Sequence, residues 1–346
     1  MTTVEESRLV TGGVDTHLDT NVAAALDPIG GLLAVGEFPA TPAGNRALLG
    51  FFERHGEVVR VGIEGTSSYG TSLARFLREA CVEVVEVDRP NRQSRRRTGK
   101  SDPADAIEAA RAALSGRAQG QGKTKDGNVE AIRALLVAKR SCRSTKITTL
   151  NQIRHLGFTG PEVLRARLRG VSRHDLGPLA ASLRPRAGTD PVLFATKTAI
   201  SLLGHRVLAL DAEKERIDAL LGPLVEETAP ALRSIFGVGV DHAATLLVTA
   251  GDNPDRIASE AAFAHLCGVA PIPASSGKTT RLRLNRGGDR SANRALWGVV
   301  ITRMRNDPRT KAYVERRLKE GRSKKEIIRI LKRYVAREVY RSLPRG

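Results

Sequence analysis

The chain has 346 residues, of which 41% are hydrophobic and 4% aromatic, and it carries a formal net charge of +19 with a sequence pI near 10.6. This length predicts two or three domains, and the scattered aromatic residues argue against an extended platform for stacking bases. The sequence shows no run of 18 apolar residues, no signal-peptide pattern and no CxxC spacing, which argues against a membrane partner, a disulfide framework and a zinc ribbon and predicts a cytoplasmic protein with buried cysteines.

The N-terminal region alternates short apolar runs with turn residues. Residues 8–38 predict three strands of an antiparallel meander, because each apolar run ends at Gly, Asp or Pro. Further along the chain, the pattern predicts a helix over 42–55, a strand over 58–64, a helix over 69–80 and a strand over 82–88. A meander followed by alternating helices and strands is the order of an α/β RNase H-like domain.

A basic loop at 89–100 follows the last of these strands. It precedes a helix that we expect from Ser101 to Leu114, since Pro103 suits the first helical turn. The Gly/Gln/Lys-rich segment 116–127 then has the composition of a linker. The loop cations that are candidates for binding nucleic acid are Arg92, Arg95, Arg96, Arg97 and Lys100.

Residues 128–228 are predicted to be largely helical, with a helical hairpin or coiled coil around 195–222 that we interpret as spacer and oligomerisation region. A glycine-containing turn at 234–239 precedes an apolar helix at 241–250. The turn fits a helix-hairpin-helix element, whose N–H groups can hold a phosphate, and equally an ordinary helix boundary. The predicted domains are 1–115 (catalytic, RNase H-like), 116–228 (linker and helical or coiled-coil region) and 229–346 (mainly α, with a basic tail).

The positive charge is concentrated at the C-terminal end. Residues 278–346 contain 22 Lys and Arg against 6 Asp and Glu, a net charge of +16. One charge run is often only a solvated helix face, but this density predicts a polyanion partner. The candidate contacts are Lys278, Arg281, Arg283, Arg286, Arg290 and Arg294.

Four carboxylates occupy positions that suit metal-dependent phosphoryl transfer. Asp15 ends the first predicted strand, Glu64 ends the fourth, and Asp102 and Asp105 lie three residues apart at a helix start. Mg²⁺ prefers such hard oxygen ligands, and two-metal chemistry needs several of them to converge. Taken singly, each acid is also explained as a helix cap, a partner of the helix dipole or a strand-end charge.

Three motifs carry a family resemblance: GVDTH (13–17), IEGTSSYG (63–70) and GKSDPADA (99–106). They resemble the signatures of the DEDD transposases of circle-forming insertion sequences, a group that includes pilin-gene invertases and bridge-RNA-guided recombinases. The catalytic domain of that family is similar to the RuvC-type Holliday-junction resolvases. The resemblance continues in FGVGVDHAATLL, AFAHLCGVAPIPASSGK and NRGGDRSANRAL.

The resemblance implies that Asp15, Glu64, Asp102 and Asp105 bind Mg²⁺, with Mn²⁺ as a substitute. It places the serine nucleophile, which forms a covalent DNA intermediate, at Ser276, with the adjacent Ser275 as a rival. By composition alone this Ser-Ser-Gly is an ordinary turn. The implied partners are double-stranded DNA at element ends and target, a structured noncoding guide RNA, and further copies of the chain in dimers and tetramers at the bacterial nucleoid.

The sequence also departs from the family pattern. Leu18 stands where many members have lysine, and Phe236 where they commonly have proline. None of the seven histidines has metal-ligand spacing, and no GxxxxGK[ST] loop is present, which disfavours an ATP-driven transposase. Two alternatives stay open: a RuvC-like Mg²⁺-dependent structure-specific nuclease that uses water as nucleophile, and a non-enzymatic nucleic-acid-binding protein.

Overall fold

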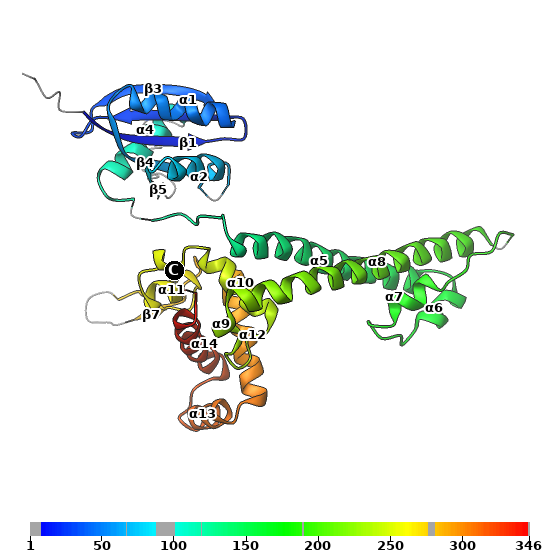
Figure 1. The fold of residues 1–346 in the computed structure, drawn as a ribbon. Helices are drawn as coiled ribbons and strands as arrows, with labels where there is room; N and C mark the ends of the chain where they lie inside the picture. The colour runs from blue at the N-terminus through cyan, green and yellow to red at the C-terminus, as the bar shows by residue number, and fades with distance from the viewer. Residues whose placement is uncertain are drawn as a thin grey trace, which may run out of the picture. The chain divides into compact units, whose positions relative to one another are not determined.

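The computed structural model describes residues 8–66, 68–87, 101–118, 120–188, 190–275 and 281–344. These residues form two compact units, residues 1–125 and 126–346. The first is mixed α/β and the second is mainly helical (Figure 1). The predicted three-part division of the chain stays a prediction.

A five-stranded sheet is the centre of the first unit, with strand order β3-β2-β1-β4-β5. β1, β2 and β3 pair antiparallel, while β1 pairs parallel with β4 and β4 with β5. This arrangement is compatible with the predicted RNase H-like fold. The elements of this unit are β1 (Leu9–Thr16), β2 (Thr20–Leu26), β3 (Leu32–Pro39), α1 (Pro42–Glu53), β4 (Glu57–Glu64), α2 (Thr71–Glu79), β5 (Glu83–Val87) and α4 (Asp102–Leu114).

The two faces of the sheet are covered differently. On one face, large side chains of α1 and α2, including Phe52 and Leu77, form a core with Val14 and Ile63. On the other face, α4 presents alanines to the sheet. Successive residues of a strand point to opposite faces, so Gly12 of β1 faces Phe52 while the next residue faces α4.

The second unit consists of a long helical hairpin and a C-terminal helical bundle. α5 and α8 lie side by side along their length (Figure 1). The start of α5, near residues 129–136, and the end of α8, near residues 221–225, belong to the same core as the C-terminal helices. The elements are α5 (Asn128–Thr159), α6 (Glu162–Leu168), α7 (Leu176–Ala181), α8 (Pro191–Thr228), α9 (Pro230–Arg233), α10 (Val240–Ala250), the short 3₁₀ helix η1 (Pro254–Arg256), α11 (Glu260–Leu266), β6 (Ile272–Pro273), β7 (Leu282–Arg283), α12 (Arg290–Asn306), α13 (Pro308–Lys319) and α14 (Lys324–Arg341).

The sequence predicts a hairpin or a coiled coil around 195–222. The hairpin is wrong for this segment, and the coiled-coil alternative is compatible with helix α8. Helix α8 is one continuous helix, which begins with the Asp190 carboxylate accepting a hydrogen bond from the Leu193 N–H at 2.9 Å. Its partner is α5: Lys139 pairs with Asp218 at 2.5 Å, and Lys146 pairs with Asp211. Because the residue numbers rise in α5 as they fall in α8, the two helices are antiparallel.

Helix α8 is also long and apolar enough to span a membrane by length and composition alone, with a mean hydropathy of 1.2 in its most apolar 18-residue window. The core helix of a water-soluble hairpin meets the same criterion. Buried residues of α8 such as Ile200 and Val207 pack with Leu150, Ile153 and Leu176 of the neighbouring helices. We therefore interpret α8 as one arm of the hairpin.

The cysteine prediction holds for two of three residues. Cys142 and Cys267 are buried, and burial raises the pKa of the Cys267 thiol to about 12. Cys81 is exposed, so its predicted burial is wrong. It follows the C-terminal end of α2, where the chain turns with a φ of 61°, and this turn carries the side chain away from the core.

Candidate functional site

The carboxyl ends of β1 and β4 bring two of the predicted acids onto one face of the sheet. Gly13 and Gly62 are paired neighbours on these strands, and both face α4. Asp15 and Glu64 each lie two residues further along. Because the strand period is two, both acids belong to the face that α4 covers.

Close packing of α4 brings the other two acids to the same edge. A Cβ built on Gly13 would lie 2.1 Å from the Ala110 backbone nitrogen, and one on Gly62 would lie 2.6 Å from the Ala109 carbonyl oxygen. The helix backbone therefore rests directly on the two strands. Asp102 and Asp105 are in the first turn of α4, at the end of the helix that lies near Asp15.

Asp15, Asp102 and His17 form the centre of the site. His17 Nε2 is 3.2 Å from Asp15 Oδ2 and 3.5 Å from Asp102 Oδ2. Each of the three residues offers a ligand atom, and these atoms lie within 4.8 Å of one another. Asp15 and Asp105 are buried, whereas Asp102 and His17 are partly exposed, so the cluster opens towards solvent on one side.

The electrostatics of the cluster are unfavourable for Asp15. Burial raises the pKa of the Asp15 carboxyl, and the charges of Asp105 and Asp102 raise it further, while His17 acts in the opposite direction. An acid whose folded-state pKa is raised destabilises the fold once it ionises, so its stability contribution is lost as the pH rises through the folded pKa.

This donor set fits a divalent cation. A hard cation would neutralise the carboxylates that raise the pKa of Asp15, and carboxylate oxygens such as those of Asp15 and Asp102 are the ligands Mg²⁺ favours. The assignment of all four acids as metal ligands stays a prediction, as does the choice of Mg²⁺.

His17 is the residue that the sequence pattern missed. The spacing of the seven histidines gives no metal site, yet in the structure His17 forms a cluster of possible metal ligands with the carboxylates of Asp15 and Asp102. The available signal was the Asp-x-His spacing in GVDTH, since side chains two apart at a strand end lie on one side of the sheet.

The predicted nucleophile and part of the predicted basic surface lie outside the described residues: Arg92, Arg95, Arg96, Arg97, Lys100, Ser276 and Lys278. The neighbouring Ser275 is described. Its hydroxyl accepts a hydrogen bond from the Arg281 N–H at 3.2 Å, next to the β6–β7 ladder. Five predicted cations in the second unit are exposed, namely Arg281, Arg283, Arg286, Arg290 and Arg294.

The glycine turn at 234–239 follows the one-turn helix α9 and precedes α10. Two carbonyl oxygens of this turn accept hydrogen bonds from arginines: Phe236 O from Arg303 at 2.9 Å, and Val238 O from Arg233. These contacts fix the turn to its surroundings, as an ordinary helix boundary requires. Phosphate binding at this turn stays a prediction.

Two family matches cover both units. Residues 12–156 match the DEDD transposase family of IS110-type elements, and residues 229–315 match the transposase IS116/IS110/IS902 family. A 43.6 kDa protein of insertion element IS110 from Streptomyces coelicolor is 32% identical over 124 residues, which are 35% of this chain and 30% of that protein. A 42 kDa protein of insertion element IS900 from Mycobacterium paratuberculosis is 30% identical over 192 residues, or 51% and 48% of the two chains. The matched segments thus span at most about half the length of these relatives.

Proposed function

Because the chain belongs to the DEDD transposase family of IS110-type insertion elements, we propose that it cuts and rejoins DNA at the ends of such an element. The observation that carries the proposal is the convergence of Asp15 and Asp102, which come from a strand end and a helix start 87 residues apart in the chain. The first unit acts in this proposal as an RNase H-like, RuvC-like catalytic domain.

In this proposal Mg²⁺ is held by four acids, Asp15, Glu64, Asp102 and Asp105, and Mn²⁺ can take its place. The bound cation supplies Lewis acidity and charge neutralisation at the scissile phosphate. His17 orients the carboxylates of Asp15 and Asp102 through its Nε2. The scissile phosphate reaches the site from the side of Asp102, which is partly exposed, since Asp15 and Asp105 are buried.

Ser276 is the proposed nucleophile. Its hydroxyl oxygen forms a bond to phosphorus, the bond from phosphorus to one sugar oxygen breaks, and the serine proton ends on that leaving hydroxyl. The phosphodiester is kept as a serine ester, which allows rejoining without an added energy source. The hydrogen bond that the Ser275 hydroxyl accepts from the Arg281 N–H favours Ser276 over Ser275, because it assigns Ser275 a structural role.

Exposed arginines of the second unit supply the contacts to double-stranded DNA. Arg283, Arg290 and Arg294 are exposed and belong to the segment of net charge +16. Binding of this kind releases counterions and weakens steeply with salt. A structured noncoding RNA is the proposed guide, and the nucleoid in the cytoplasm is the proposed location.

The helical hairpin is the proposed contact between subunits, which form dimers and then a tetramer. Several of its large apolar side chains are exposed: Phe158 of α5 at 69%, and Leu202 and Leu220 of α8 at 66% and 62%. Exposed apolar side chains gathered on one structural element indicate an interaction surface. Strand exchange needs several cuts held together, and such a surface would join the subunits.

A covalent-adduct assay tests this function. The full chain, its element's noncoding RNA, Mg²⁺ and a labelled DNA carrying the element junction are incubated, and the products are separated on a denaturing gel. We expect a protein–DNA adduct that is lost in Ser276→Ala and retained in Ser275→Ala. Cleavage that survives Ser276→Ala without any adduct would instead assign the chain as a metal-dependent nuclease with water as nucleophile.

A further inference from the structure

A cavity of about 940 Å³ lies between α12, α14 and the segments 268–271 and 284–290. Its volume is within the range of sites for small organic ligands. One wall is a single face of α12, where Arg290, Arg294 and Trp297 follow one another at helical spacing and are all exposed. Trp297, the only tryptophan of the chain, is 48% exposed.

The lining is strongly positive. Among the residues that the structure describes, it contains six cations and no acid: Arg286, Arg290, Arg294, Arg329, Lys332 and Arg333. Within the described part of the chain, Glu260 pairs with Arg333 at 2.9 Å, and the carboxylate of Asp289 caps α12 through the Ser291 and Ala292 N–H groups. Nearby acids are therefore already engaged, so the cavity keeps a net positive charge.

Lys332 lies half-buried in this wall. Its ammonium donates a hydrogen bond to Asn293 Oδ1 at 2.8 Å. Burial lowers the pKa of Lys332, and the charge of Arg329 lowers it further. A cation held in this way gains most from an anion entering the cavity.

The cavity is held in shape by hydrogen bonds and close packing. Asn293 Nδ2 donates to the carbonyl oxygens of Cys267 and Gly268 at 3.1 and 3.0 Å. A Cβ on Gly288 would lie 2.3 Å from the Gly268 nitrogen, so the two glycine segments are in direct backbone contact. These contacts fix the segments around Gly268 and Gly288 to each other and to α12.

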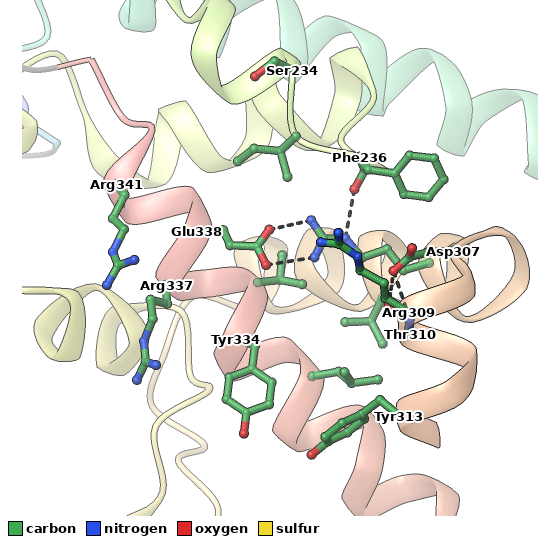
Figure 2. Close-up of a pocket in the computed structure, with 15 residues that line it drawn as sticks. Ser234, Phe236, Asp307, Arg309, Thr310, Tyr313, Tyr334, Arg337, Glu338 and Arg341 are labelled. Atoms are coloured by element: carbon green, nitrogen blue, oxygen red, sulfur yellow. Dashed lines mark hydrogen bonds and ion pairs between the residues drawn. The ribbon is translucent and has the colours of Figure 1, made fainter. Parts of the chain in front are cut away.

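A neighbouring cavity of about 750 Å³, shown in Figure 2, is less positive because its lining includes acids. There Arg303 is held by Glu338, at 2.7 and 3.1 Å, and by the Phe236 carbonyl oxygen. Asp307 accepts from the Thr310 N–H at 3.1 Å. Its two acids, Asp307 and Glu338, offset two of its four arginines, so the first cavity, with six cations, is the more positive and the better complement to a polyanion.

We propose that the first cavity holds one unpaired nucleotide of a nucleic-acid strand, with its base stacked on Trp297 and its phosphates bound by Arg290 and Arg294. This inference rests on the proposed function, because it deepens how the chain binds nucleic acid. The occupant is unpaired because stacking on a side-chain ring requires a base face that a duplex covers. The low aromatic content argues against an extended platform that stacks several bases. A pocket for one base needs only one aromatic ring, which Trp297 supplies.

The place of the cavity gives the nucleotide a role. Pro271 and Leu284, which line it, directly precede β6 and follow β7. A strand in the cavity therefore lies next to the β6–β7 ladder. We expect an unpaired nucleotide to anchor the strand at this ladder.

Tryptophan fluorescence tests this inference, since Trp297 is the only emitter of its kind. The full chain is titrated in EDTA with single-stranded dT12, with U12 RNA, with a duplex of equal length and with inorganic polyphosphate. Saturable quenching by dT12 or U12, stronger than by the duplex and absent with polyphosphate, is the expected result. The stronger of the two single strands identifies the sugar that the cavity prefers. Equal quenching by polyphosphate, or none by either single strand, would overturn the proposal.

Variants separate stacking from charge in an anisotropy assay with labelled dT12. Trp297→Ala should weaken binding about tenfold, within the range for one base–aromatic stack, and Trp297→Phe should recover part of it. Arg294→Ala should also weaken binding, whereas Arg305→Ala, the same change further along α12 and outside both cavities, should leave it within about twofold. Unchanged binding in Trp297→Ala would contradict the proposal. The assay contains no Mg²⁺, so a chain that binds dT12 but never cleaves DNA would contradict only the proposed function.

Discussion

Asp15→Asn and Asp102→Asn are each expected to lower Mg²⁺-dependent DNA cleavage by about a thousandfold, the upper end of the range for removing one electrostatic participant from an active site. Asparagine keeps the shape of the side chain and removes the charge. The possible ligand atoms of the two residues lie within 4.8 Å of one another, so removing either carboxylate leaves an incomplete cation site. Cleavage is measured by single-turnover kinetics on junction DNA, and Mg²⁺ binding by calorimetry.

Stability distinguishes loss of the site from loss of the fold. Burial and the neighbouring acids raise the pKa of Asp15, so its ionisation destabilises the metal-free protein above that pKa. Asp15→Asn removes this cost, and its metal-free melting temperature near pH 8 should equal or exceed that of the wild type. Glu37→Gln, which changes an exposed acid on β3 of the same sheet, is the matched control and should keep full activity. Unchanged cleavage in Asp15→Asn would exclude it from the metal site.

Gly13→Ala is expected to destabilise the first unit by about 3 kcal/mol, at the upper end of the range for overpacking. The added Cβ would meet the Ala106 carbonyl oxygen at 2.3 Å and the Ala110 nitrogen at 2.1 Å, and neither backbone atom can rotate away. α4 must therefore move off the sheet. Since α4 carries Asp102 and Asp105, Mg²⁺ affinity and cleavage should fall with stability.

The control for this variant is Gly50→Ala in α1. A Cβ there meets no atom within 4 Å. Alanine in a helix interior is favoured over glycine by roughly 0.5–1 kcal/mol, so this variant should be slightly stabilised. The free energy of unfolding is measured by urea denaturation followed by circular dichroism. A Gly13→Ala protein as stable as the wild type would show that α4 does not rest on β1 as described.

Much of the first unit follows from local patterns in the sequence. The strands and helices around Asp15 and Glu64 are predictable because apolar runs alternate with turn residues, and Pro103 marks the start of α4. The convergence of Asp15 and Asp102 then follows from their positions at element ends. A family resemblance in the same motifs points to the same residues, and the matched families support it.

Other features depend on contacts that no local pattern shows. His17 acquires its role from Asp102, 85 residues away in the chain. In the sequence Gly13 looks like any other strand glycine, because the need for glycine arises only from the backbone of α4 that packs against it. The sequence leaves both a hairpin and a coiled coil open around 195–222, because the apolar residues of α8 fit a hairpin as well as one helix paired with α5. Trp297 could not be predicted as a binding residue from a sequence with 4% aromatic residues, because its cavity forms only when α14 packs beside α12.

The central claim is that the carboxylates at the ends of β1 and β4 and the start of α4 hold a cation that acts on the scissile phosphate. The most direct test replaces a non-bridging oxygen of that phosphate with sulfur and compares cleavage rates in Mg²⁺ and Mn²⁺. Because Mg²⁺ prefers oxygen ligands and Mn²⁺ accepts softer ones, the account predicts slow cleavage in Mg²⁺ and recovery in Mn²⁺, with no recovery in Asp102→Asn. Cleavage that is unaffected by sulfur and persists in EDTA would contradict it.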